Sequence, residues 1–299
     1  MIRIAAIAIA ASLTLAHLPA RAQDEDAPAA PVGRAPVEQV VVRSLADGNP
    51  MLTGYLFKPV GVAGKTPAVV LMHNRDGVYS SRADGDYRAS TLTPRFKFWG
   101  QYWASRGYHV LLVDSYGARG FPQGFGDTPV KDRPDSVDDV DARPLDAFGA
   151  LQYLRTLPAV DGDRVGLMGF SNGGSATLAT MADDKPGDMR RIGFRAAIAL
   201  YPGCAMKKRF DRKGYRPYAP VRVFMGAADK GASPEVCKAL VDRSRKANGD
   251  IDLTLYPEVG HGFDEPGRKT QGVEANAQAT ADTRARAAVF FEQALAPRQ

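Results

Sequence analysis

The sequence has few residues of the types that bind metals or cofactors. Its 299 residues include two cysteines and four histidines. Beyond residue 22 the histidines are His73, His109 and His261, and no two of them have the His-x-x-x-His spacing typical of zinc sites. The glycine-rich stretch 169–174 fits neither the dinucleotide-binding motif nor the P-loop. We therefore expect no metal and no cofactor.

Long apolar runs are also missing beyond the N-terminus. Arg3 precedes an apolar segment over residues 4–16, and Ala20-Arg21-Ala22 fits the small-x-small rule for signal-peptide cleavage. The segment is shorter than the roughly 20 residues that span a bilayer. Residues 1–22 are therefore expected to be a cleaved signal peptide, which predicts an exported protein, periplasmic or secreted, with no stable membrane insertion. A cytosolic N-terminal helix is the alternative.

The charge is small and evenly spread. Removing residues 1–22, with Arg3 and Arg21, lowers the formal net charge by two, from +6 to +4. This is too weak to predict nucleic-acid binding. Residues 23–36 are rich in proline and alanine and are expected to form a flexible leader. Residues 37–299 remain as one domain.

Apolar strands alternate with amphipathic helices in this domain. The turn Asp47-Gly48 predicts an antiparallel hairpin at its start. The order that follows predicts an α/β fold with a mostly parallel sheet and helices on both faces. The expected strands are 37–45, 51–59, 67–72, 108–113, 164–168, 196–200, 221–225 and 251–256, and the expected helices are 94–105, 145–157, 175–179, 234–247 and 277–295.

One stretch predicts a nucleophile. Gly169-Phe170-Ser171-Asn172-Gly173 lies between an apolar strand and a helix of small residues, which is the context of the G-x-S-x-G motif. A serine that attacks a carbonyl must project from such a tight turn. The backbone N–H of Asn172, at the start of the helix, can then face a developing oxyanion. The alternative is an ordinary glycine-rich turn.

A nucleophilic serine needs a histidine base and a carboxylate that orients it. In open α/β sheets such residues follow the carboxyl ends of strands. Asp229 follows the strand 221–225, and His261 lies in a glycine-flanked loop after the last strand. His109 lies within a strand, and His73 ends the strand that precedes the expected oxyanion loop. Taken singly, His261 could be an ordinary loop histidine and Asp229 a capping residue.

Together these segments resemble the dienelactone hydrolase family of the α/β-hydrolase superfamily over about residues 40–295. The resemblance implies an α/β-hydrolase fold and a serine hydrolase that cleaves esters or lactones of small molecules through Ser171, His261 and Asp229. The segments are 73–77, Asp114-Ser115-Tyr116-Gly117-Ala118-Arg119-Gly120, Gly169-Phe170-Ser171-Asn172-Gly173-Gly174, Gly226-Ala227-Ala228-Asp229 and Gly260-His261-Gly262-Phe263.

Two departures from the family pattern bear on the substrate. The best-known members use a cysteine nucleophile and a glutamate in the loop after the third strand, whereas this chain has Ser171 and Asn74. A more general esterase is therefore expected. The alternatives are an acyltransferase or exopeptidase on the same fold, or a non-catalytic binding protein.

The resemblance also suggests how substrate is held. The second oxyanion donor should be the backbone N–H of Asn74 or Arg75, with Arg75 favoured. Asn74 and Arg119 are expected to contact substrate, because Arg119 matches an arginine that holds a substrate carboxylate in the family. The alternative is that Arg119 fixes the long loop 117–140. Basic residues in loop 202–219 either steer an anionic ester or are merely solvated (Lys207, Lys208, Arg209, Arg212, Lys213 and Arg216).

The two cysteines form a candidate pair. Cys204 follows one expected strand and Cys237 opens the helix after the next strand, so neighbouring strands can bring them together. In an oxidising compartment an isolated pair can bridge. Tyr201-Pro202-Gly203-Cys204 also resembles exported family members. We expect a Cys204–Cys237 disulfide, with two separate buried thiols as the alternative.

Overall fold

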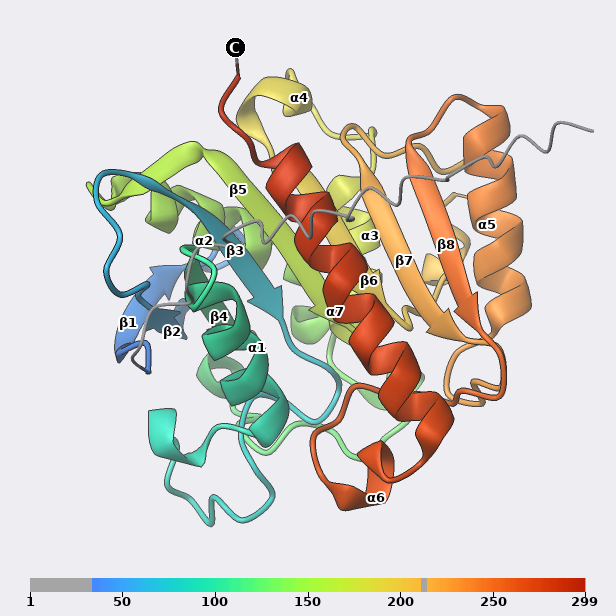
Figure 1. The fold of residues 1–299 in the computed structure, drawn as a ribbon, viewed down its shortest axis with the longest axis horizontal. Coiled ribbons are helices and arrows are strands. Elements are labelled where there is room, and N and C mark those ends of the chain that lie inside the picture. Colours follow the sequence, from blue (N-terminus) through green and yellow to red (C-terminus); the bar gives the residue numbers. More distant parts are fainter. Residues whose placement is uncertain (1–33, 211–213, 299) are drawn as a thin grey trace, which may run out of the picture. The chain divides into compact units, whose positions relative to one another are not determined.

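The computed structural model describes residues 34–210 and 214–298, in which eight strands form one sheet (Figure 1). The predicted signal peptide and most of the predicted leader lie outside the described residues. The strand order is β1-β2-β4-β3-β5-β6-β7-β8. The strands are β1 (Val37–Arg43), β2 (Met51–Phe57), β3 (Thr66–Met72), β4 (His109–Asp114), β5 (Val160–Phe170), β6 (Ala196–Leu200), β7 (Val221–Gly226) and β8 (Ile251–Tyr256).

The sheet is antiparallel at one edge and parallel elsewhere. β2 pairs antiparallel with both β1 and β4, which confirms the predicted N-terminal hairpin. From β4 through β3, β5, β6 and β7 to β8 every pairing is parallel. Because parallel strands end at the same edge of a sheet, the loops after β3, β4, β5, β6, β7 and β8 start from one edge.

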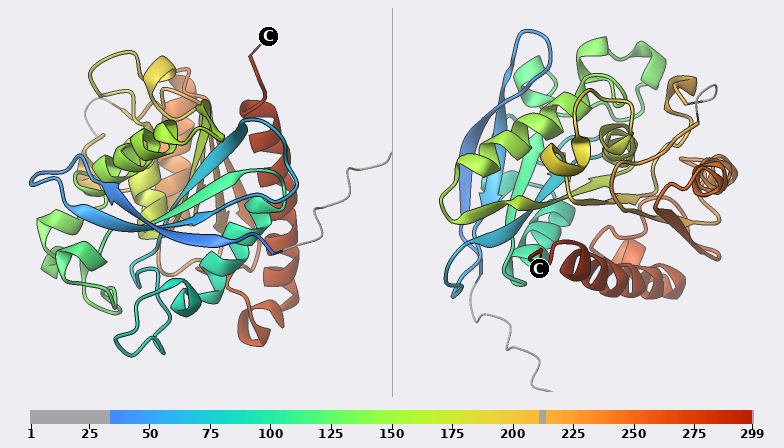
Figure 2. Two further views of the ribbon diagram at one scale, coloured as in Figure 1. Left: turned by 90° about the vertical axis from the view of Figure 1, so that its left-hand side faces the viewer. Right: turned by 90° about the horizontal axis from the view of Figure 1, so that it is seen from above.

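Helices cover both faces of the sheet, as expected. α1 and α7 lie on one face, and α2, α3 and α5 lie on the other (Figure 2). The short helices α4 and α6 were not predicted. The helices are α1 (Pro94–Ala104), α2 (Arg143–Thr156), α3 (Asn172–Met181), α4 (Met189–Ile192), α5 (Pro234–Lys246), α6 (Arg268–Gln271) and α7 (Glu274–Ala294).

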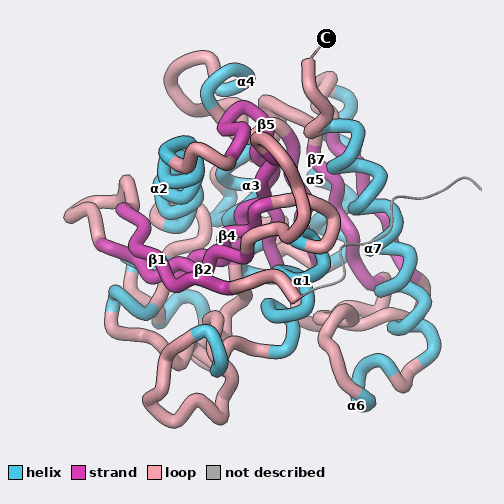
Figure 3. The backbone as a smooth tube through the Cα atoms, turned by 60° about the vertical axis from the view of Figure 1, so that its left-hand side comes forward, coloured by secondary structure: helices cyan, strands magenta, loops and turns pink. Residues whose placement is uncertain are grey.

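The helices flank the central strands (Figure 3), and the buried side chains of the core come from these strands and helices. β4 and β6 are buried along their whole length, because helices cover both of their faces. On α1, the aromatic side chains of Phe96, Trp99 and Trp103 are fully buried and belong to this core. No helix among the residues described is both long and apolar enough to cross a bilayer.

The last two residues of the predicted leader make hydrogen bonds to the domain. The N–H of Ala35 donates to the Gln101 side chain on α1 (2.8 Å), whose amide donates back to the Ala35 carbonyl (2.9 Å). The Lys58 N–H donates to the Pro36 carbonyl (3.1 Å). Residues 35 and 36, the last two of the predicted leader, therefore contact the domain.

Candidate active site

Ser171 lies in a strained turn between β5 and α3. Its backbone has φ 52° and ψ −114°, a conformation that costs free energy in a non-glycine residue. A Cβ atom on Gly169 would lie 2.0 Å from the Gly173 carbonyl oxygen, and one on Gly173 would lie 2.1 Å from the Met72 carbonyl oxygen. The two glycines of the motif are thus required by close backbone contacts, and the turn presents Ser171 at the carboxyl edge of the sheet.

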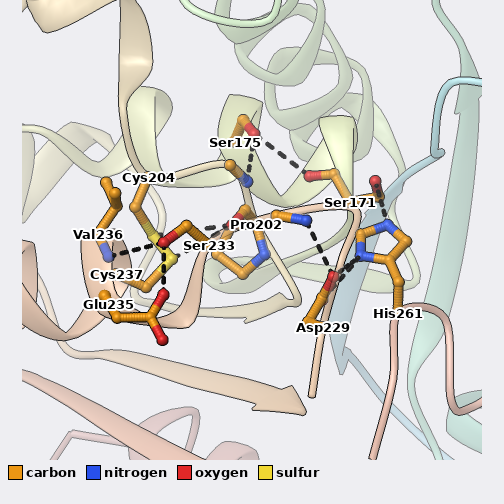
Figure 4. The surroundings of a disulfide bond; sticks show 12 residues. Ser171, Ser175, Pro202, Cys204, Asp229, Ser233, Glu235, Val236, Cys237 and His261 are labelled. Atoms are coloured by element: carbon orange, nitrogen blue, oxygen red, sulfur yellow. Dashed lines mark hydrogen bonds and ion pairs between the residues drawn. A yellow bond between two sulfur atoms is a disulfide. The ribbon is translucent and has the colours of Figure 1, made fainter. Parts of the chain in front are cut away.

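The structure brings Ser171, His261 and Asp229 into one chain of hydrogen bonds (Figure 4). The Ser171 hydroxyl oxygen lies 2.8 Å from His261 Nε2, and His261 Nδ1 lies 2.8 and 3.0 Å from the two Asp229 carboxylate oxygens. Because Nδ1 faces a carboxylate, the ring proton belongs on Nδ1, and Nε2 is left to accept the serine proton. Asp229 in turn accepts from the N–H groups of Gly231 and Ala232 (2.7 and 2.9 Å), which fixes its side chain.

A second buried carboxylate, which the sequence did not point to, holds the loop that carries His261. Asp264 accepts from the Trp99 indole N–H (2.8 Å) and from the Tyr201 hydroxyl (2.6 Å). The Tyr201 ring also packs edge-on against the His261 ring, with 4.7 Å between the ring centres. Arg95 forms an ion pair with Asp264 (3.3 Å). The position of the histidine is therefore set by α1 and by the loop after β6.

Two backbone N–H groups near Ser171 are free to bind an oxyanion. Asn172 is the first residue of α3, and Arg75 lies in the loop after β3. Neither of these two N–H groups has an acceptor among the residues that the structure describes. Both residues line the same pocket as Ser171 and His261. The arrangement places a serine hydroxyl, an imidazole and two residues with unpaired backbone N–H groups around one space.

This pocket has a volume of about 350 Å³. Its walls come from loops after several strands, so a bound molecule would contact segments far apart in the sequence. Besides the four residues just described, its lining includes Val130, Arg133, Asp138, Asp139, Val140, Ser175, Gly203, Ala205, Met206, Lys207, Gly231 and Ala232.

Cys204 and Cys237 form a disulfide (S–S 2.00 Å), so the predicted pairing is confirmed and the two separate thiols are excluded. The bond joins the loop after β6 to α5, beside the pocket (Figure 4). Gly203 and Ala205 flank Cys204 and line one wall of the pocket. The disulfide therefore anchors that wall.

Arg119, which was expected to contact substrate, lies outside the Ser171 pocket. Its guanidinium group makes a bidentate ion pair with Asp146 (2.8 and 2.9 Å) and donates to the Ser115 carbonyl (2.6 Å). The Arg119 side chain is only 6% exposed, and the residue is absent from the lining of the Ser171 pocket. With its donors occupied inside the protein, it fixes the start of loop 117–140, which was the alternative.

Asn74 also lies elsewhere than expected. Its side-chain amide donates to Asp76 (2.9 Å), and the residue lines a neighbouring pocket of about 630 Å³ instead of the pocket that contains Ser171.

The basic residues of loop 202–219 are largely neutralised. Lys207 forms an ion pair with Asp138 (2.7 Å), and Arg209 forms one with Asp184 (2.7 Å). Arg216 pairs with Asp183, while residues 212 and 213 lie outside the described part of the chain. These ion pairs favour the alternative in which the basic residues of this loop do not steer an anionic ester. Among the described residues, no group of three or more His, Cys, Asp or Glu side chains is arranged to bind a metal ion.

Comparisons with known proteins agree with this geometry. The model of the dienelactone hydrolase family matches residues 52–295. A curated Bradyrhizobium protein named "Probable 2-oxo-3-(5-oxofuran-2-ylidene)propanoate lactonase" is 26% identical over 218 residues, which cover 71% of this chain and 78% of the relative.

Solved structures share the fold. A dienelactone hydrolase-like promiscuous phosphotriesterase from metagenomic libraries superposes with a TM-score of 0.66 at 22% identity, over 87% of this chain and 99% of the other. Esterase 2 of Thermogutta terrifontis, in the form phosphorylated by paraoxon, gives a TM-score of 0.61 at 21% identity, over 88% of this chain and 96% of the other. At these identities the likeness shows the fold alone.

Proposed function

Since the chain belongs to the dienelactone hydrolase family and is a hydrolase acting on ester bonds, we propose that it cleaves small carboxylic esters or lactones through Ser171, His261 and Asp229. The observation that supports this most strongly is the continuous hydrogen-bonded chain from the serine hydroxyl through the imidazole to the buried Asp229 carboxylate. The serine at its end opens into a pocket large enough for a small ester.

In the proposed mechanism the Ser171 oxygen attacks the ester carbonyl while His261 Nε2 takes the hydroxyl proton. The negative charge that develops on the carbonyl oxygen is bound by the N–H groups of Asn172 and Arg75. His261 then gives the proton to the leaving alcohol oxygen, and an acyl-enzyme remains. A water molecule, deprotonated by His261, attacks the acyl group and releases the acid, which restores the Ser171 hydroxyl. Asp229 holds the imidazole in the required tautomer and stabilises its charged form.

Turnover of p-nitrophenyl esters with short to medium acyl chains tests this proposal. We expect hydrolysis by the native protein and a loss of at least about a thousandfold in kcat for Ser171→Ala, because the nucleophile is removed. Ser136→Ala is the control, since Ser136 is exposed and outside the Ser171 pocket. A Ser171→Ala protein with unchanged turnover would exclude Ser171 as the nucleophile.

The same proteins separate the alternatives. If no ester is hydrolysed, labelling by paraoxon, which phosphorylates the Thermogutta esterase, shows whether Ser171 is reactive. A labelled Ser171 would mean that the site is competent and the substrate class is wrong, whereas an unlabelled one would favour a binding protein. Added alcohols or amines that capture the acyl group in preference to water would indicate an acyltransferase.

We also propose that the protein is exported to an oxidising compartment, periplasmic or extracellular. The predicted signal peptide at residues 1–22 is one support, and the Cys204–Cys237 disulfide is a second and independent one.

A further inference from the structure

A buried ion pair lies beside the proposed oxyanion site. Asp139 precedes α2, and Arg143 is the first residue of that helix. The Arg143 side chain is completely buried, and its Nη1 lies 2.9 Å from the Asp139 carboxylate. Taking two charges out of water costs free energy that their attraction does not reliably offset, so such a pair is weak evidence for stability alone. Its contacts suggest another role.

The pair joins the two segments that carry the proposed N–H donors. The second carboxylate oxygen of Asp139 accepts from the Asn172 side-chain amide at the start of α3. Nη2 of Arg143 donates to the His73 carbonyl at the end of β3 (2.6 Å). The two segments touch directly as well, because a Cβ atom on Gly173 would lie 2.5 Å from that same carbonyl oxygen.

The ring of His73 completes the connection to Arg75. Its Nε2 accepts from the Ser115 N–H (3.1 Å), so the ring proton is on Nδ1, which donates to the Asn74 carbonyl (2.6 Å). The Asn74 carbonyl and the Arg75 N–H belong to one planar trans peptide, in which they point in opposite directions. By holding the carbonyl, His73 therefore fixes the direction of the Arg75 N–H.

We propose that Asp139, Arg143 and His73 are positioning residues that set the distance and direction between the two oxyanion donors. They would do so without touching the reacting atoms, through the Asn172 side chain on one side and the Asn74–Arg75 peptide on the other. This inference rests on the proposed function, because in that function the two N–H groups bind the oxyanion. Donors must lie about 2.7–3.1 Å from the oxyanion to act, so a small displacement of either segment weakens the hydrogen bonds from the two N–H groups to the oxyanion.

The same helix offers a matched control. Asp146 lies on α2, whereas Asp139 precedes that helix, and Asp146 is likewise a buried carboxylate paired with a buried arginine, Arg119. Its other contact is the Ser44 hydroxyl, and it makes no hydrogen bond to residues 73–75 or 171–173. Replacing either aspartate by asparagine removes one charge from one buried pair on α2, but only Asp139 is bonded to the proposed oxyanion site.

The test compares Asp139→Asn with Asp146→Asn on p-nitrophenyl acetate. Both variants should lose stability, but only Asp139→Asn should lower kcat, by about 10- to 100-fold, while KM stays within about threefold. Asn172→Ala keeps its backbone N–H and should lower kcat similarly. Adding Asp139→Asn to it should cost little more, because the two act through one contact. If Asp139→Asn does not fold, the kcat of Asn172→Ala alone tests whether the contact between Asp139 and Asn172 positions the oxyanion donors.

Two results would overturn the inference: a folded Asp139→Asn protein with native kcat, or equal losses of kcat in the two aspartate variants. Amide hydrogen exchange gives a readout that does not depend on turnover. Exchange in segments 73–77 and 171–174 should accelerate in Asp139→Asn and not in Asp146→Asn. If the native protein hydrolyses no ester, the proposed function fails, while the exchange rates still decide whether the ion pair positions these segments.

Discussion

His73 links the proposed oxyanion loop to the pH dependence of stability. Burial lowers the pKa of His73 well below its ordinary value of 6.5, and the nearby positive charge of Arg143 lowers it further. The folded protein therefore holds His73 neutral at pH values at which the unfolded chain already binds a proton. Stability from this residue is fully present above about pH 6.5 and is lost as the pH falls below it, by up to about 1.4 kcal/mol per pH unit.

This predicts the behaviour of His73→Gln. The variant should be less stable than the native protein at neutral pH, but its free energy of unfolding should fall less steeply between about pH 6.5 and pH 5, by about 1 kcal/mol per pH unit. Urea unfolding at several pH values measures both slopes. Burial raises the pKa values of Asp114 and Asp139, which affects both proteins and so cancels in the comparison. Equal slopes would mean that His73 is not held neutral in the fold.

For single residues, the sequence predicts a role in the site where a residue follows the end of a strand or lies in a motif. Ser171, Asp229 and His261 were predicted together on that basis, and they lie within hydrogen-bond distance in the structure. Arg119 was assigned to substrate because the family resemblance implies that role. Its actual partner, Asp146, is 27 residues away and belongs to no motif, so the sequence does not reveal the pairing. Asp139 was missed because it belongs to no motif and because Asn172, which is 33 residues away, is brought to it only by folding.

The strands and long helices were predicted almost completely, because buried parallel strands appear as continuous apolar runs and covering helices have a helical period. The differences are local. β5 begins at Val160 instead of residue 164. In its added N-terminal part Val160 pairs with Thr66 of β3, and a register shift separates this pair from the regular pairing that starts at Val165 and Ala68. α4 and α6 were missed, since four residues cannot show a helical period.

The disulfide permits a prediction about one loop and one helix. It joins residues 33 apart, and in the loop-entropy view a cross-link of that span stabilises a protein by about 3–4 kcal/mol. Cys204→Ser/Cys237→Ser should lose about that much free energy of unfolding. KM for esters should rise more than kcat falls, because Gly203 and Ala205 flank Cys204 and line the pocket, whereas Asp229 is held by the N–H groups of Gly231 and Ala232.

Urea unfolding and ester kinetics, each with and without a reductant, measure both effects. The native protein under reductant should behave like the double serine variant, and reductant should not change that variant. A reduced native protein with unaltered stability and KM would show that the bond restrains neither α5 nor the pocket wall.

For the whole molecule, two observations from different parts of the chain bear on whether the protein is exported. The predicted signal peptide over residues 1–22 implies that the chain leaves the cytosol, and the disulfide is of a kind that persists in oxidising compartments and is rare in reducing ones. The position of the bond beside the Ser171 pocket adds a functional consequence. A chain retained in the cytosol should fold, but with a loosened pocket wall.

Expression of two forms in a bacterium tests this prediction, with thiols alkylated at lysis. The full chain should be recovered outside the cytosol with Gln23 as its first residue and with no free thiol after denaturation. A form lacking residues 2–22 should stay in the cytosol, carry two free thiols and show the lower stability of the double serine variant. N-terminal sequencing and mass spectrometry of the alkylated proteins measure each point. An uncleaved full chain in the cytosol would contradict export, whereas an exported chain with two free thiols would contradict only the role given to the disulfide.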